Sequence, residues 1–411
     1  MNRSPLLSLA PFWLFLLFFK FGGNIHYTLL SPLGEGFFNA EIAGIIIGLS
    51  SLIQLGLDIP AGLLLDRFGY IRMLRIGTIA MVITALSLAF IPGSLGFVVS
   101  ALLSSLGWVF LAPGVNAYLL SSAPKEKVEQ FMSTRDIFDA SGVMLSALVI
   151  SFMINSSQRM IGFSAAIVAG ISFIFLLFTK KDKISVHEEI KTPHHFFYIR
   201  RNVFKGLVSA FKKLDSAGWL LLAHGLCSSA LYAVIWFIIP LMIADPSKKI
   251  FGISLGIFDF AIIILGSLLG RLSKRMNYRV AVSSGLLIFA VMTAFLGFGT
   301  GWVFLIIGFL ATAGEEFTNI SLWSWLSKKD KDHQSDGAIS GTISMFQDLG
   351  WTIGPIAAGF LYIAIGPEWT ISIASMPIFL TFILSLAFSP KGKGIFEKEE
   401  RLHPHKLRHK R

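Results

Sequence analysis

The sequence predicts an all-α membrane protein in which twelve transmembrane helices form two pseudo-symmetric six-helix halves. The first observation is composition: 14% of the residues are charged, against about 25% in ordinary globular proteins, and 54% are hydrophobic. The second is that the apolar residues fall in runs of roughly 20 residues, the length of a helix that crosses a bilayer. The third is a short motif that recurs in both halves of the chain.

Twelve apolar runs meet this length criterion. In chain order they cover residues 6–30, 42–65, 73–90, 95–120, 137–154, 161–178, 218–243, 250–269, 280–298, 302–326, 338–365 and 369–388. The first run is too long for a secretory signal peptide and is followed by eleven more, so we expect it to be retained as a helix.

The distribution of basic residues supports this count. If both termini are cytoplasmic, three of the 35 lysines and arginines (Arg159, Lys248 and Lys249) lie in outer loops and Lys20 lies inside the first span. The remaining 31 lie in inner segments, which is the asymmetry that the positive-inside rule predicts. The formal charge of +11 therefore indicates contact with anionic lipid and no nucleic-acid partner.

The repeated motif reads GLLLDRFGYIR at residues 62–72 and GSLLGRLSKR at residues 266–275. Positions 62 and 266 differ by 204 residues, and so do positions 67 and 271. Each copy lies between two apolar runs. A duplicated bundle with a charged turn in each half is the layout of membrane transporters whose halves move around a central site.

This repeat divides the chain into four parts. We expect an N-terminal six-helix half at 1–179, a cytoplasmic linker at 180–216, a C-terminal six-helix half at 217–389 and a basic cytoplasmic tail at 390–411. The linker, with Phe196 and Phe197, is predicted to contain an interfacial amphipathic helix. The single cysteine, Cys227, can form no intrachain disulfide, and neither His194-His195 nor any other pattern indicates a metal site.

The motif and the twelve-span layout resemble the major facilitator superfamily along nearly the whole chain. The loop between its second and third helices has the pattern Gly-x-Leu-Ala-Asp-Arg-x-Gly-Arg-Lys, which Gly62, Leu64, Asp66, Arg67 and Gly69 match. Tyr70 and Ile71 replace the basic pair, and Arg72 follows. The resemblance implies the superfamily's transporter fold, a small-molecule substrate and transport by alternating access.

The same resemblance gives the motif a role as a gate. In the family, the aspartate is thought to latch the two halves on the cytoplasmic side, which would make Asp66 a gate residue. On physical grounds, Gly62 allows a close helix approach, Gly69 permits the tight turn, and Asp66 can pair with nearby arginines. The expected gate motif comprises Gly62, Asp66, Arg67, Gly69, Arg72, Gly266 and Arg271, with Gly270 in place of the acid in the second copy.

The 204-residue offset also aligns polar residues inside the membrane. Lys20 aligns with His224, Asn24 with Ser228, and Thr28 with Tyr232. A spacing of four places each trio on one helical stripe. A lysine in the bilayer needs a partner or a wet cavity, and pairing with a carboxylate is one alternative. We predict a mid-membrane substrate cavity lined by Lys20, Asn24, Tyr27, His224, Ser228, Tyr232 and Asn319.

Acidic residues within the spans are candidates for ion coupling. The candidates are Glu315, Glu316, Asp348 and Asp259. Glu315 and Glu316 are adjacent and point about 100° apart on a helix, so one of them should line the cavity. Arg135, Asp136 and Asp139 could form inner-face ion pairs only. Gly350, Gly354 and Gly359 form a small-residue stripe for close packing, with a proline that could flex the helix.

These features predict a secondary active transporter that uses a proton or ion gradient and needs no other cofactor. An organic anion or zwitterion is the weakly favoured substrate, because Lys20 and His224 are both cationic when protonated. A drug or solute efflux antiporter is the alternative, although the fifth span lacks the glycine-proline pattern of drug–proton antiporters. A transporter-like sensor or a polytopic membrane enzyme is the alternative from another class. We expect no catalytic residue, a monomer, and a place in the plasma membrane.

Overall fold

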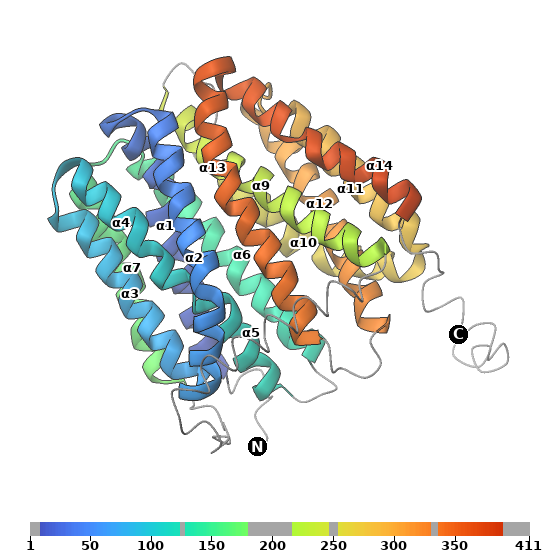
Figure 1. The fold of residues 1–411 in the computed structure, drawn as a ribbon, viewed down its shortest axis with the longest axis horizontal. Helices are drawn as coiled ribbons and strands as arrows, with labels where there is room; N and C mark the ends of the chain where they lie inside the picture. Colours follow the sequence, from blue (N-terminus) through green and yellow to red (C-terminus); the bar gives the residue numbers. More distant parts are fainter. Residues whose placement is uncertain (1–8, 124–127, 180–215, 246–253, 330–335, 389–411) are drawn as a thin grey trace.

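The computed structural model describes residues 9–123, 128–179, 216–245, 254–329 and 336–388, and every element in these ranges is a helix. Figure 1 shows two groups of helices side by side, α1 to α7 in one group and α9 to α14 in the other. The predicted all-α architecture is therefore confirmed. The linker, the tail and the residues of the expected interfacial helix lie outside the described ranges.

The N-terminal half contains α1 (Ala10–Phe37), α2 (Ala40–Phe68), α3 (Tyr70–Phe90), α4 (Gly93–Trp108), α5 (Leu111–Ser122), α6 (Val128–Met153) and α7 (Gln158–Leu177). The C-terminal half contains α9 (Ser216–Ala244), α10 (Ser254–Arg275), α11 (Tyr278–Leu296), α12 (Gly301–Lys329), α13 (Asp336–Ala374) and α14 (Met376–Phe388). Most of these helices are a few residues longer than the apolar runs that predict them. The additional residues lie at the helix ends and include polar ones.

Ten segments of the described chain are long and apolar enough to cross a membrane. One of them, Thr342–Phe388, has 47 residues and contains the last two predicted spans, which a non-helical Gly366 separates. α1 is not among the ten, because Lys20, Asn24 and His26 lower its mean hydropathy. Adding α1 and dividing the long segment in two gives the twelve predicted spans.

The fourth predicted span is one apolar run but two helices. α4 ends at Trp108, and α5 begins at Leu111. Pro113 explains the break, since proline has no N–H to donate to the carbonyl of Val109, four residues earlier. The expectation of a continuous helix over 95–120 is wrong at this point, and the break places Trp108 at the end of a helix.

Two glycines mark opposite ends of the bundle. Gly69 has φ of 93° and joins α2 to α3 in a tight turn, as its place in the motif predicts. Asn39 lies at the other end of α2 and caps it by accepting a hydrogen bond from the N–H of Ile42 at 2.8 Å. We call these two ends of the bundle the Gly69 end and the Asn39 end. Gly366, with φ of 80°, turns the chain at the Asn39 end.

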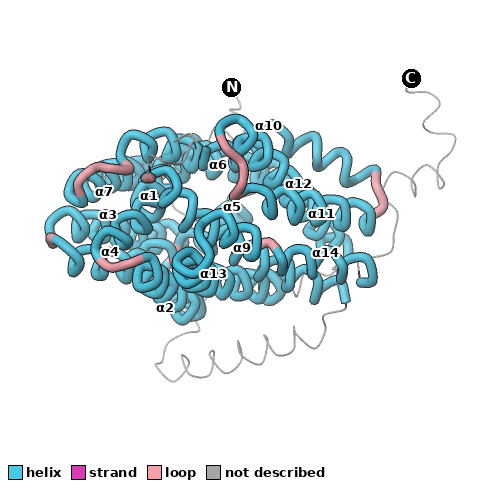
Figure 2. The backbone as a smooth tube through the Cα atoms, turned by 90° about the horizontal axis from the view of Figure 1, so that it is seen from above, coloured by secondary structure: helices cyan, strands magenta, loops and turns pink. Residues whose placement is uncertain are grey.

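The two halves meet along two seams. Seen along the bundle, α2 lies beside α13 on one side of the interface and α6 lies beside α10 on the other (Figure 2). The α2–α13 seam is close-packed at the Asn39 end. A Cβ at Gly44 would overlap the carbonyl of Pro355, and one at Gly48 would lie 2.7 Å from the carbonyl oxygen of Thr352. These glycines therefore let the two helix backbones approach each other.

The stripe Gly350, Gly354 and Gly359 packs on two partners. Gly350 and Gly354 lie against α9, where a Cβ would come within 2.5 Å of the Leu226 carbonyl and 2.6 Å of the Ala230 carbonyl. Gly359 lies against the backbone of α2 at Ala40. The helix breaks at Gly366 and continues through Pro355, and a flex point at the proline stays a prediction.

The seams are open toward the Gly69 end. A Cβ at Gly56 or Gly62 on α2, or at Gly266 or Gly270 on α10, would meet no atom of the described residues within 4 Å. The expectation that Gly62 supports a close helix approach is therefore wrong for this conformation, because nothing packs against it. The close contacts of the halves lie at the Asn39 end, and the glycines near the Gly69 end face open space.

Candidate functional site

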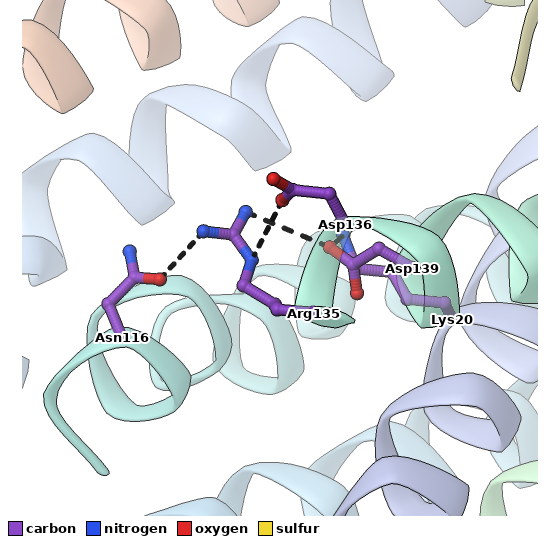
Figure 3. Close-up of polar contacts among 5 residues, drawn as sticks. All are labelled: Lys20, Asn116, Arg135, Asp136 and Asp139. Carbon is purple, nitrogen blue, oxygen red and sulfur yellow. Dashed lines mark hydrogen bonds and ion pairs between the residues drawn. The ribbon is translucent and has the colours of Figure 1, made fainter. Parts of the chain in front are cut away.

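The best-defined polar cluster of the N-terminal half surrounds Lys20 of α1. Its Nζ lies 3.2 Å from Oδ2 of Asp139 on α6 and 5.4 Å from the ring centroid of Trp108. Arg135 approaches the same Oδ2 with Nη2 at 3.9 Å. Figure 3 shows Asp139 between the two cationic side chains. The ion pair of Lys20 with Asp139 ties α1 to α6, and the contact of Lys20 with Trp108 adds α4.

Small residues make room for this cluster. A Cβ at Gly142 of α6 would lie 2.5 Å from the Leu17 carbonyl and 2.9 Å from the Cβ of Lys20. A Cβ at Gly23 would lie 2.7 Å from the ring of Trp108. Both glycines therefore let their neighbours approach α1 directly, which brings Asp139 within reach of the ammonium group and places the indole beside it.

Arg135 links the cluster to the broken fourth span. Its Nη1 donates to Oδ1 of Asn116 on α5 at 2.8 Å, and its Nε lies 3.5 Å from Oδ1 of Asp136 (Figure 3). The interpretation of Arg135, Asp136 and Asp139 as inner-face ion pairs only is wrong, because Asp139 binds Lys20. In the structure Lys20 pairs with the carboxylate of Asp139, which is the alternative given in the sequence analysis.

The C-terminal half presents a second cluster, around Tyr232 of α9. Its phenol lies close enough to Glu315 of α12 to interact with that carboxyl group. The Tyr232 ring lies 5.9 Å from that of Phe289 in a stacked arrangement. Glu315 therefore points into its own half, toward α9.

Glu316 points elsewhere. It interacts electrostatically with Asp136 of the opposite half. That the two adjacent glutamates face different directions stays a prediction, and Glu316 is the one with an electrostatic interaction to the N-terminal half.

Asp259 of α10 also faces the N-terminal half. It lies close enough to Lys20 and Asp139 to interact with both charges. Its Oδ2 is buried and has no hydrogen-bond partner among the described residues. A carboxylate oxygen of this kind is available to a proton or to a cationic group of a ligand.

The other predicted cavity residues have varied surroundings. Tyr27 of α1 contacts Trp351 of α13 edge-on, with ring centroids 5.8 Å apart, and so bridges the two halves. Ser228 donates to the carbonyl of Gly225 in its own helix at 3.4 Å. Asn24 and Asn319 are half-buried on α1 and α12.

His224 is buried, and neither of its ring nitrogens has a hydrogen-bond partner in the described part of the chain. It therefore forms no hydrogen bond to Lys20, its counterpart at the 204-residue offset. The expectation that the two side chains share one cavity remains a prediction.

The gate motif is only partly defined. The side chain of Asp66 lies outside the described part of the structure, so its role as a latch stays a prediction. Arg67 lies over the ring of Phe68 at 5.2 Å, Arg72 is exposed, and Nε of Arg271 donates to the Ser267 carbonyl of its own helix.

Two arginines outside the predicted motif, Arg75 and Arg279, form hydrogen bonds to other helices. Nη2 of Arg75 donates to the carbonyl of Leu176 at 3.3 Å, and Nη2 of Arg279 donates to the carbonyl of Ala387 at 3.1 Å. Applying the 204-residue offset to the arginines would have found this pair.

A third polar cluster lies on the α2–α13 seam. The carboxyl groups of Asp58 of α2 and Asp348 of α13 lie close enough to interact across the seam. Gln54, one turn before Asp58, donates from Nε2 to Oδ1 of Asp348 at 3.4 Å. Asp348 was expected as a coupling residue, but its partner Asp58 was not, because their positions in the sequence give no sign of the contact.

The three clusters define a class of protein. Polar and acidic side chains from two helix bundles face each other inside a membrane-spanning fold, and no group of three or more metal-binding side chains is found among the described residues. This is the arrangement of a membrane transporter with its site between two halves.

The comparisons with known proteins identify the family. The family profile described as Major Facilitator Superfamily matches residues 12–340 and 221–410. The chain therefore belongs to the major facilitator superfamily. It is a multi-pass membrane protein and a secondary transporter of a small molecule, and this family is not a class of enzymes.

The similar curated proteins carry different functional descriptions. An uncharacterized MFS-type transporter of Methanocaldococcus jannaschii is 22% identical over 343 residues, which cover 79% of this chain and 82% of that protein. Multidrug resistance protein 2 of Bacillus subtilis is 22% identical over 78% of this chain and 79% of its own length. Multidrug resistance protein MdtH of Salmonella typhimurium is 30% identical, but over only 33% of this chain and 34% of its own.

Solved structures share the fold. The nucleoside transporter NupG superposes with a TM-score of 0.73 and 16% identity, covering 93% of this chain and 100% of that chain. The xylose transporter XylE of E. coli, in an inward-open conformation, has a TM-score of 0.70 and 14% identity, covering 96% of this chain and 99% of that chain. At these identities the similarity concerns the fold.

Proposed function

We propose that this transporter moves an organic cation or a zwitterion and that proton movement drives it. The observation that carries the proposal is the electrostatic interaction of acidic residues across the interface: Asp259 of one half with Lys20 and Asp139 of the other, and Glu316 with Asp136. Carboxyl groups in this position can bind a proton or a cationic ligand, and the two compete.

The charge balance favours a cation over an anion. Five carboxyl groups occupy the two clusters, namely Asp136, Asp139, Asp259, Glu315 and Glu316, against two cationic side chains, Lys20 and Arg135. Lys20, which supports an anionic substrate in the sequence analysis, already has Asp139 as its partner. An anion would have to displace that carboxylate and approach the remaining acids, which is electrostatically unfavourable.

The coupling candidates differ in what surrounds them. Glu315 interacts with Tyr232, Asp348 interacts with Asp58, and Asp259 has a buried oxygen without a donor among the described residues. Proton coupling requires a group that is neutral in one access state and ionised in the other. Asp259 and Glu316 meet the geometric requirement best, because each faces the opposite half and must change neighbours when the halves move.

The transport direction that fits this proposal is export of the cation from the cell in exchange for a proton, that is, efflux by antiport. Two of the similar proteins are named multidrug resistance proteins, and an acidic site that exchanges a proton for a cation serves such a role. This is the efflux alternative of the sequence analysis, and it replaces the organic anion as the favoured substrate.

We also propose that the Gly69 end faces the cytoplasm and that both termini lie there, in the plasma membrane. The concentration of lysine and arginine on that side supports this orientation. With this orientation the described conformation is closed outside and open inside. A single bundle with its site between its own halves supports a monomer, and the proton gradient takes the place of any cofactor.

A binding screen tests the substrate class. Purified protein would be exposed to lipophilic cations, zwitterions and organic anions, and stabilisation against heat would be measured for each compound. We expect cations to stabilise the protein and Asp259→Asn to remove most of the effect. Glu41→Gln, at the start of α2 and away from the three clusters, is the matched control and should keep it. Stabilisation by anions alone would overturn the proposed substrate class.

A further inference from the structure

The contact between Asp58 and Asp348 is unusual because both partners are acids. Each residue belongs to a different half, and Asp348 accepts a hydrogen bond from Gln54, one helical turn before Asp58, which places the two carboxyl groups close enough to interact. Oδ2 of Asp58 is buried and receives no hydrogen bond from any N–H or O–H that the described residues carry. Gln54 donates to Oδ1 of Asp348, and the amide therefore fixes one oxygen of that carboxyl as an acceptor.

Elementary chemistry decides what such a contact requires. An ionised carboxylate only accepts hydrogen bonds, whereas a protonated carboxyl donates one. Two carboxyls can therefore share a hydrogen bond only when one of them carries a proton. If both are ionised, the bond is lost and the two like charges repel each other in a medium that screens them poorly.

The position of the pair gives this chemistry a mechanical consequence. The α2–α13 seam is held at the Asn39 end by the backbones around Gly44, Gly48 and Gly359. Asp58 and Asp348 lie further along the same two helices toward the Gly69 end, where Gly56 and Gly62 face open space. The pair is thus at the boundary between the packed part of the seam and its open part.

We propose that Asp58 and Asp348 share one proton across the two halves and act as a proton-dependent brace that stabilises the conformation closed at the Asn39 end. When the proton leaves, the brace becomes a repulsive contact and the halves rearrange. The brace is separate from the substrate clusters, so it does not depend on the substrate class proposed above.

The charged groups on the helices that pack against α2 and α13 include Lys20 and Glu35 of α1, Arg72 and Arg75 of α3, and Arg279 of α11. Lys20 of α1 binds Asp139, and Arg75 of α3 and Arg279 of α11 bind helix-end carbonyls. On α9, Gly225 packs against Gln347 of α13, the residue before Asp348. The titratable residue next to Gly225 is His224. The charged group that acts on each carboxyl of the pair is the other carboxyl.

A distance measurement tests the brace without any substrate. Spin labels would be placed at Ile76 of α3 and Leu272 of α10, which are exposed near the Gly69 end, in a Cys227→Ala background. Pulsed electron resonance would record the distance distribution in lipid nanodiscs from acidic to alkaline pH. We expect long distances at acidic pH, where the brace is protonated, and a shift to shorter distances as pH rises.

Amide variants make the test specific. Asp58→Asn and Asp348→Asn each supply a permanent N–H donor at the contact, so either should keep the long distances at all pH values. Gln54→Ala removes a neutral donor and should retain the pH response. The proposal is overturned if the wild-type distribution does not change with pH, or if both amide variants titrate like the wild type. A lack of cation binding would overturn the proposed substrate and leave the brace intact.

Discussion

Arg75 and Arg279 occupy equivalent positions in the two halves, 204 residues apart, and each donates a hydrogen bond to a backbone carbonyl at the end of the last helix of its half. Arg75 of α3 reaches Leu176 of α7, and Arg279 of α11 reaches Ala387 of α14. A guanidinium group at a helix C-terminus satisfies orphan carbonyls and interacts favourably with the helix dipole. The pseudo-symmetry of the fold thus extends to individual side-chain contacts.

Removing either arginine should destabilise its own half. Arg75→Ala or Arg279→Ala is expected to cost about 1 kcal/mol, because a charged donor is lost at a partly exposed site. Thermal unfolding of the purified protein measures the effect. Arg72→Ala is the matched control, since Arg72 is exposed on the same helix. An equal loss of thermal stability in Arg72→Ala and Arg75→Ala would show that the helix-end contact has no special role.

Filling the α2–α13 seam should prevent closure at the Asn39 end. A side chain at Gly48 would run into the Thr352 carbonyl and Ile356, so Gly48→Val should force the helices apart. Labelling of a cysteine placed at Ala40, in a Cys227→Ala background, should become faster. Gly56→Val, on the same helix but facing open space, should leave the labelling rate unchanged. Equal labelling rates in both variants would contradict the assignment of a closed end.

The Lys20–Asp139 pair should show energetic coupling. Lys20→Met leaves Asp139 with the more distant Arg135, and Asp139→Asn leaves Lys20 over Trp108. Because both side chains are partly exposed, we expect a coupling of about 1 kcal/mol in a double-mutant cycle on thermal stability. Strictly additive single and double variants would indicate that the ion pair contributes no stability of its own.

The gate role of Asp66 gives a separate expectation. Asp66→Asn should shift the balance between inward and outward accessibility while leaving substrate affinity in the competent state nearly unchanged. Site-directed labelling at Gly93 and at Arg72, near opposite ends of the bundle, would report the shift. Loss of binding with no change in accessibility would instead place Asp66 in the substrate site.

The sequence predicts the helices well, because bilayer-spanning length and the positive-inside rule are strong physical constraints. It predicts breaks less well. Pro113 interrupts the fourth span, whereas Pro355 leaves α13 helical. Around Pro355, α13 packs closely on both α2 and α9, as the contacts of Gly44 and Gly354 show.

Contacts between distant helices are the part that the sequence leaves undetermined. Lys20, Asp259 and Glu316 can be predicted as functional from the sequence, because burying a charged side chain in the membrane interior costs free energy. Their partners depend on helix rotation and on which glycines allow close approach, as Gly142 does beside Lys20. For the same reason the pairing of Asp58 with Asp348, 290 positions apart, requires the folded structure.

The most direct test of proton coupling is accumulation in reconstituted vesicles. An imposed pH gradient should drive uphill movement of a bound cation in the wild type. Asp259→Asn and Glu316→Gln together keep the shape of the site and remove titration, so they should abolish uphill movement while still allowing exchange of cation for cation. Uphill movement that persists at the wild-type rate in this double variant would contradict a role for these acids in proton coupling.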